Sequence, residues 1–162
     1  MSLLDNMINE KMLNKIRNGE MKDLKLLNLR EVNLFNADLK FANLMDVDLR
    51  DANLSDADLR GADLRYANLE GADLTGADLS RADLRGADLM RAWLREAKLG
   101  DTDLREANLR GAELLGVYLG FIDLRGADLR DIDPRDIDLT GLATWDQNTR
   151  WPKGFKANFP LN

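Results

Sequence analysis

A leucine recurs every five residues through most of this chain. A spacing of five from Leu29 to Leu139 gives 23 positions, and 22 of them hold leucine, with Pro134 the exception. In an α-helix, leucines five apart would lie about 140° from one another around the axis, so no apolar face would form. A strand buried on one face needs a period of two instead. The five-residue period therefore excludes a long helix or strand and indicates a repeat architecture.

Each unit has five positions, which we name relative to the leucine. The leucine occupies the central position, and the alanine position two residues earlier holds Ala in 15 of the 23 units. Between them lies the outward position, mostly Asp or Asn, and after the leucine come the first and second corner positions. Residues two apart in an extended segment point the same way, so Ala and Leu should face inward while the outward position faces water. Each unit is predicted to be a very short strand followed by a bend, and repeated bends wind a coil.

The motif A-[DN]-L-x-x, seen in Ala72, Asp73, Leu74, Thr75 and Gly76, resembles that of the pentapeptide-repeat family. The resemblance covers roughly residues 27–141. It implies an all-β fold, a right-handed quadrilateral β-helix (a solenoid) with four sides and about 20 residues per coil. We expect three parts: an N-terminal helical cap over residues 1–26, the β-helix over 27–141 and a C-terminal cap segment over 142–162.

The N-terminal segment carries the signals of a helix that covers the first coil. Ser2 and Asp5 resemble a capping box, and Gly19 is a helix stop. Five apolar residues share one broad helical face: Leu4, Met7, Ile8, Met12 and Ile16.

The C-terminal segment is rich in aromatic residues, which we interpret as a lid on the leucine column: Trp145, Trp151, Phe155 and Phe159. Trp151-Pro152 with Gly154-Phe155 is similar to segments that follow the last coil in cyanobacterial relatives. The register fades after Leu139. Pro134 lacks an N–H group, so we interpret it as a terminator of the repeat.

Composition excludes several kinds of chemistry. The chain has no cysteine and no histidine, which rules out thiolate sites, serine–histidine catalysis and histidine-bound zinc on this chain alone. The sequence contains no glycine-rich phosphate loop. We therefore expect no enzymatic activity, no catalytic residue, no cofactor and no metal site.

Localisation and partner class also follow from composition. No window approaches the roughly 20 apolar residues of a membrane span, and the N-terminus lacks the apolar core of a signal peptide. The expected protein is cytoplasmic, without a membrane partner. A net charge of −6 argues against direct binding to nucleic acid.

Stacking by 20 residues would place the charged side chains in vertical columns. An acidic column at the outward position should lie beside a basic column at the first corner position, which offsets the repulsion between like charges. A flat wall of this kind does not converge on one point as a calcium site must. The two columns are Asp23, Asn43, Asp63, Asp83, Asp103 and Asp123, and Lys25, Met45, Arg65, Arg85, Arg105 and Arg125.

Departures from the repeat cluster between Trp93 and Ile122. Trp93 and Tyr118 replace outward Asp or Asn, Lys98 reverses a charge, and two corner positions hold apolar residues. Exposed aromatic clusters mark protein interfaces. We therefore predict a partner-binding patch, used for another protein or for self-association; the alternative is a set of aromatic residues that lie flat on the wall without a partner. The patch consists of Trp93, Leu115, Tyr118 and Phe121, with Met90 approaching from the other side.

The predicted function is that of a protein–protein interaction scaffold. The sequence does not identify the partner, and the protein is also expected to form a homodimer as one possible state. The alternative is a DNA-mimicking protein that binds DNA gyrase, as some relatives do. Residues 26–139 hold 24 acidic and 15 basic residues, a net charge of −9. Over a tower about 28 Å tall this is one charge per roughly 3 Å, whereas duplex DNA carries one per about 1.7 Å. The lower density favours the scaffold.

Overall fold

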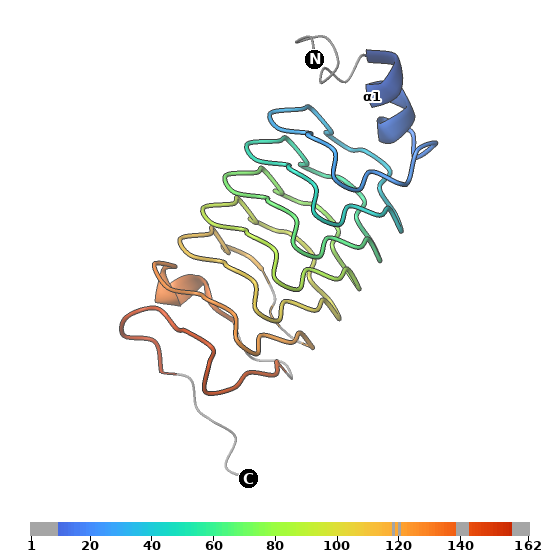
Figure 1. The fold of residues 1–162 in the computed structure, drawn as a ribbon. Helices are drawn as coiled ribbons and strands as arrows, with labels where there is room; N and C mark the ends of the chain where they lie inside the picture. The colour runs from blue at the N-terminus through green and yellow to red at the C-terminus, as the bar shows by residue number, and fades with distance from the viewer. Residues whose placement is uncertain (1–9, 118, 120, 139–142, 157–162) are drawn as a thin grey trace.

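The chain forms a tower of stacked coils (Figure 1). The computed structural model describes residues 10–117, 119, 121–138 and 143–156 of the 162. Parallel bridges join residues 20 apart, such as Asp23 with Asn43 and Asp63 with Asp83, so each coil takes 20 residues. The repeat solenoid is confirmed. The bridges are isolated rather than grouped in strands, because each unit turns again after a single paired residue.

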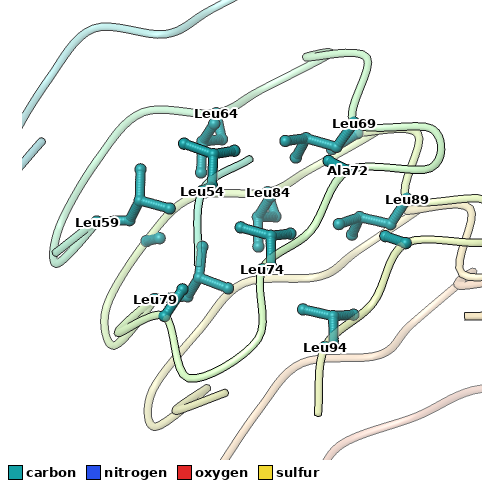
Figure 2. Close-up of a cluster of buried hydrophobic side chains, with 14 of the residues drawn as sticks. Leu54, Leu59, Leu64, Leu69, Ala72, Leu74, Leu79, Leu84, Leu89 and Leu94 are labelled. Atoms are coloured by element: carbon teal, nitrogen blue, oxygen red, sulfur yellow. The ribbon is translucent and has the colours of Figure 1, made fainter. Parts of the chain in front are cut away.

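Every coil has four sides, which we number by their central leucines. The first side carries Leu24 and Leu44, the second Leu29 and Leu49, and the third and fourth follow at the same spacing. Each central leucine from residue 24 to residue 129 is buried, as are the alanine positions from Ala37 onward (Figure 2). Burial of one leucine side chain contributes about 1.5–3 kcal/mol, so this column supplies the core.

The second corner position turns the chain from one side to the next. All 22 such residues from position 26 to position 131 have φ between 52° and 78°, and only seven of them are glycine. The left-handed conformation costs an L-residue about 1–2 kcal/mol. It occurs at Phe41, Tyr66 and Arg81 because the hydrogen bonds to both neighbouring coils and the buried leucines hold the backbone there.

Outward Asp and Asn residues have a structural role at these turns. Their side-chain oxygen accepts a hydrogen bond from the backbone N–H of the first corner residue, as Asp73 Oδ1 does from Thr75 at 3.0 Å. The same contact recurs along the tower, for example from Phe35 to Asn33 and from Met90 to Asp88. Such Asx turns explain why the repeat prefers these two residue types.

Helix α1 (Glu10–Arg17) lies beside the first coil (Figure 1). Leu13 and Ile16 are buried in the core cluster, and Met12 packs against it. Gly19 adopts φ 71°, as expected of a residue that ends a helix. Five residues used in the helix prediction lie outside the described part of the chain: Ser2, Leu4, Asp5, Met7 and Ile8.

The tower continues beyond the last regular unit. A short 3-10 helix, η1 (Pro134–Asp136), stands where a central leucine is replaced by Pro134, and the last described bridge on that side joins Trp93 to Glu113. The chain then returns to pair Thr144 with Asp123 and Arg150 with Asp128, at spacings of 21 and 22. The predicted boundary at residues 141 and 142 lies outside the described residues.

Aromatic side chains gather where the chain leaves the last coil. The rings of Trp145 and Trp151 pack edge to face, with their centroids 5.9 Å apart. The ring of Trp151 also stacks on that of Phe155, with a centroid separation of 4.8 Å. All three pack against the core cluster. Phe159, the fourth predicted aromatic, lies outside the described residues. Within the residues that the structure describes, no helix is long and apolar enough to cross a membrane.

Candidate partner-binding surface

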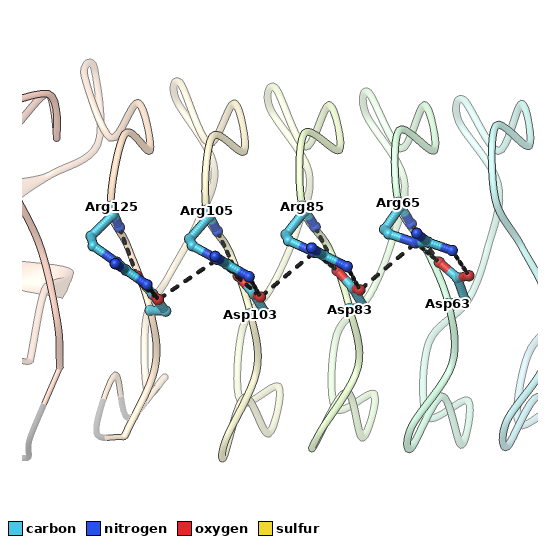
Figure 3. A network of polar contacts seen from close by, with 8 residues as sticks. Asp63, Arg65, Asp83, Arg85, Asp103, Arg105 and Arg125 are labelled. Atoms are coloured by element: carbon cyan, nitrogen blue, oxygen red, sulfur yellow. Dashed lines mark hydrogen bonds and ion pairs between the residues drawn. The ribbon is translucent and has the colours of Figure 1, made fainter.

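From Asp63 to Arg125, the predicted acidic and basic columns form a continuous chain of ion pairs on the first side of the tower (Figure 3). Arg85 donates to both carboxylate oxygens of Asp83, at 2.8 and 2.6 Å. Its Nε atom also lies 3.6 Å from Asp103 in the next coil. Arg65 and Arg105 repeat this arrangement. The prediction that the basic column offsets the acidic one is confirmed here.

These ion pairs lower the pKa of several aspartates. The side-chain hydrogen bond from Arg65 lowers the pKa of Asp63. On the fourth side, the hydrogen bond from Arg60 is the main cause that lowers the pKa of Asp58 from 3.8 to about 2. Both carboxylates therefore stay ionised and paired at neutral pH. No group of three or more candidate metal-ligating residues occurs in the described part of the tower.

Two members of the predicted patch share one side. Trp93 lies at an outward position of the third side, and Leu115 lies at the first corner position of the same side in the next coil. They are 52% and 50% exposed. The carbonyl oxygen of Leu115 accepts from the N–H of Glu96 at 3.0 Å, which fixes the two coils side by side.

Of the other two members, the structure describes Phe121 alone, and Phe121 lies apart from this pair. Phe121 is 57% exposed but occupies the corner after the fourth side, so the width of that side separates it from Leu115. Phe121 instead lines a shallow groove of about 370 Å³ with Asp101, Asp103 and Thr144. Tyr118 lies outside the described residues. Met90 is half-buried at a corner of the second side.

The surface around Trp93 lacks the turn contacts found elsewhere. Trp93, Lys98 and Glu113 replace Asp or Asn at three outward positions, so none of them forms the Asx turn. As a result, the backbone N–H groups of Arg95 and Leu115 have no described hydrogen-bond acceptor. Corresponding N–H groups on the same side, at Ser55 and Thr75, are both bound by the outward residue.

Cations around Trp93 also lack the usual pairing. The chain has 15 arginines, and 13 of them form an ion pair with a described carboxylate. The two exceptions are Arg91 and Arg95, which flank Trp93 two residues away on either side. Lys98, at the next outward position, on the fourth side, has no carboxylate partner among the described residues either, although among the lysines only Lys22 and Lys40 form a described ion pair. We call Arg91, Trp93, Arg95, Lys98 and Leu115 the Trp93 surface.

Other exposed apolar residues were not singled out by the sequence. Phe35, Phe41 and Tyr66 are 53%, 76% and 61% exposed. Phe41 borders a shallow groove of about 530 Å³ that follows the corner between the fourth and first sides. The sequence signal was present, because Phe41 and Tyr66 are aromatic at corner positions, but it was spread along the chain rather than clustered.

Comparison with known proteins finds similarity to pentapeptide-repeat proteins. A family model described as pentapeptide repeats (8 copies) matches residues 23–51, 52–91 and 87–120. No curated protein matches the chain. The pentapeptide-repeat protein Rfr23 from the cyanobacterium Cyanothece 51142 is 30% identical, with 93% of this chain and 99% of Rfr23 covered and a TM-score of 0.43.

Two further solved structures are similar. QnrB1, a plasmid-mediated fluoroquinolone resistance protein, has a TM-score of 0.58 and 19% identity, over 77% of this chain and 68% of QnrB1. HetL from the cyanobacterium Nostoc sp. strain PCC 7120, a pentapeptide-repeat protein involved in heterocyst differentiation regulation, is 30% identical over 80% of this chain and 63% of HetL, with a TM-score of 0.33. Because the repeat model covers more than half of the sequence and the units stack in 20-residue coils, this chain belongs to the pentapeptide-repeat family.

Proposed function

We propose that this protein is a non-enzymatic scaffold that binds another protein through the Trp93 surface. The observation that carries the proposal is the exposure of Trp93 and Leu115 in adjacent coils of the third side, where Trp93 is the one apolar residue among outward positions that otherwise hold Asn, Asp or Glu. Tryptophan at the centre of an interface contributes a large share of binding energy. An apolar pair at this place has no role in the leucine core, which is complete beneath it.

Rigidity of the wall supports this function. Backbone hydrogen bonds connect Trp93 to Ala72 in one neighbouring coil, and Leu94 to Glu113 in the other, at 2.9 Å each. The indole is therefore attached to a backbone that is ordered before any partner arrives. A pre-organised surface loses less conformational entropy on binding, which increases affinity.

We also infer that the two ends of a right-handed β-helix are covered, so that the sides rather than the ends meet the partner. At the N-terminal end, the Arg17 carbonyl accepts from the N–H of Asp38 at 2.9 Å, and Arg17 Nε donates to the Asn33 carbonyl at 2.9 Å. These contacts and the packing of α1 support a helical cap. At the other end, the contacts of Trp151 with Trp145 and Phe155 support an aromatic cap. Covered ends prevent edge-to-edge pairing of coils.

The proposed partner is a protein, and the proposed compartment is the cytoplasm. The absence of cysteine fits a reducing compartment. A second copy of this chain is included as a partner, since an apolar pair on a rigid wall also suits a symmetric dimer. The DNA-mimic alternative is less favoured, because the arginines of the first side neutralise its aspartates within each coil.

Site-specific photocrosslinking tests the proposal. A photoreactive phenylalanine analogue would replace Trp93 in one variant and Asn53 in a matched control, because both occupy outward positions of the third side. We expect crosslinks to a discrete protein in lysate of the source organism from position 93 but not from position 53. Unlabelled wild type should compete, and the Trp93→Ala/Leu115→Ala double variant should not.

Two readouts separate the alternatives. A crosslinked band at twice the mass of the chain would identify a homodimer, which sedimentation would confirm. Identical bands from positions 93 and 53 would contradict the proposed surface. Tyr118→Ala in the same competition tests whether Tyr118 contributes to the surface.

A further inference from the structure

We infer that the Trp93 surface recognises an acidic, extended segment of its partner, in which two carboxylate residues flank an apolar residue in the pattern acidic-x-apolar-x-acidic. This inference rests on the proposed function and specifies the chemistry of the partner at the same surface. It rests on two independent observations, unpaired cations and an unused backbone donor, together with the spacing of the side chains.

The first observation is the charge of the surface. Arg91, Arg95 and Lys98 are all exposed and lack a described carboxylate partner, whereas the other 13 arginines of the chain are paired. Residues 91–98 hold these three cations and one carboxylate, Glu96, so this segment has a net charge of +2 in a chain of net charge −6. Their charges are available to carboxylates from outside the chain, and arginine binds carboxylates through two parallel hydrogen bonds.

The second observation is the backbone N–H of Arg95. In neighbouring coils of the third side, the equivalent N–H groups of Ser55 and Thr75 donate to the Asn53 and Asp73 side chains at 3.0 Å. Trp93 replaces that acceptor, so the Arg95 N–H has no described partner. A carboxylate of the binding segment would accept a hydrogen bond from this N–H, next to the Arg95 guanidinium.

The spacing of the side chains determines the form of the segment. Arg91 and Arg95 are four residues apart, so their Cα atoms are at most about 14 Å from each other. Arg91 stands at a turn with φ 56°, so the true separation is shorter than this limit. The two long arginine side chains reach outward to the ends of a five-residue extended peptide, about 13 Å long, whose residue i+2 points to the same face as residues i and i+4. The two outer carboxylates therefore match Arg91 and Arg95, while the apolar residue packs on Trp93 and Leu115.

Protein carboxylates fit this surface better than phosphate polymers. A nucleic acid gains affinity by neutralising many phosphates, and the surface offers only three cations. Glu96 and Glu113 border it and are exposed, so a broad polyanion would meet repulsion that a narrow peptide avoids. The apolar pair would also have no counterpart on a phosphate backbone.

Peptide display tests the inference directly. Full-length protein would be panned against a random seven-residue library, and the selected peptides would be synthesised for fluorescence anisotropy. We expect enrichment of acidic-x-apolar-x-acidic sequences whose affinity falls about tenfold or more in Arg95→Gln, because a charge-assisted hydrogen bond is lost. Arg95→Lys should recover part of the affinity. Arg85→Gln, which removes a paired arginine from the first side, is the matched control and should bind as the wild type does.

Each other outcome is informative. Selected peptides that need Trp93 but carry no acidic preference, or that tolerate Arg95→Gln, would overturn this inference and leave the proposed function standing. A library that yields no Trp93-dependent peptide would also overturn this inference, whereas the crosslinking comparison of positions 93 and 53 decides the proposed function. Stronger Arg95-dependent binding to 20-base-pair duplex DNA or to vesicles of phosphatidylglycerol and phosphatidylcholine would overturn the peptide assignment, as would self-association lost in Arg95→Gln.

Discussion

The aromatic ring of Phe41 lies over Gly61 of the next coil, so close that a Cβ atom added to Gly61 would stand 2.7 Å from ring atom Cδ1. Both residues occupy second corner positions with positive φ. Tyr66 and Gly86 repeat the relationship one coil later along another corner, again at 2.7 Å. A bulky corner residue is thus accommodated because the residue above it has no side chain.

Gly61→Ala should therefore destabilise the tower. The left-handed φ of 64° costs an alanine about 1–2 kcal/mol, and displacement of the Phe41 ring adds to this cost. In a Phe41→Ala background the added methyl group meets no ring, so only the conformational cost should remain. Urea denaturation of the four proteins in this double-mutant cycle measures the difference. An equal loss of stability in both backgrounds would show that the ring does not constrain Gly61.

The solenoid could be predicted from the sequence because the leucine at every fifth position, its most regular feature, is also the residue that must be buried in the core. Leu64 and Ala62 face inward for the reason given by the five-residue period, and the approach of Arg85 to Asp103 of the next coil follows from 20-residue stacking. Corner geometry was less predictable. Phe41 and Arg81 adopt a conformation that single-residue preferences disfavour, because contacts with two neighbouring coils outweigh the local cost.

The candidate surface was only partly predictable. Trp93 and Leu115 were identified because they break the repeat. The lack of a described carboxylate partner for Arg91 and Arg95 could not be predicted, since pairing depends on side-chain directions between coils. Nor could the separation of Phe121 be judged without knowing where the corners lie. The Asx turns were hidden because Asp at an outward position is equally expected for solubility.

Acid should weaken the tower between about pH 4 and pH 2. Asp58 has a pKa of about 2 in the folded chain, lowered from 3.8 mainly by the hydrogen bond from Arg60. Its contribution to stability is fully present above the unfolded pKa and is lost as the pH falls through the folded value. Asp48, Asp63 and Asp128 also have lowered pKa values because of their paired arginines, so the effect should be cumulative.

Urea denaturation midpoints at pH 7, 4, 3 and 2 would measure this loss. We expect the midpoint to be constant above about pH 4 and to fall as the pH decreases from 4 to 2. Arg60→Gln should make the decline smaller, because the pKa of Asp58 in the folded chain returns toward its unfolded value and Asp58 then contributes less to the pH dependence of stability. Arg81→Gln removes the exposed pair with Asp101 and should change the profile little. A midpoint that stays flat down to pH 2 would contradict the prediction.

DNA gyrase should not be a target. On the first side, Asp63, Asp83, Asp103 and Asp123 are each bound by an arginine of the same coil, so this face does not present a continuous row of negative charge as duplex DNA does. We expect no inhibition of supercoiling and no protection from fluoroquinolones at micromolar protein. A purified supercoiling assay measures both, with QnrB1 as the comparison protein. Inhibition that disappears when acidic residues are neutralised would favour the DNA-mimic alternative instead.

Trp93→Asn should make the tower more stable while it abolishes partner binding. Asparagine at this outward position would accept from the Arg95 N–H, as Asn53 does from Ser55, and one such hydrogen bond contributes about 0.5–1.5 kcal/mol. The same change removes the exposed indole from the proposed surface. Denaturant midpoints and crosslinking competition would be measured together, with Asn53→Trp as the reciprocal variant that should lose stability. A Trp93→Asn protein that is less stable than the wild type would show that Trp93 stabilises the fold, because loss of an interface residue should leave the wall intact. A Trp93→Asn protein that still competes as well as the wild type would show that Trp93 does not contribute to partner binding.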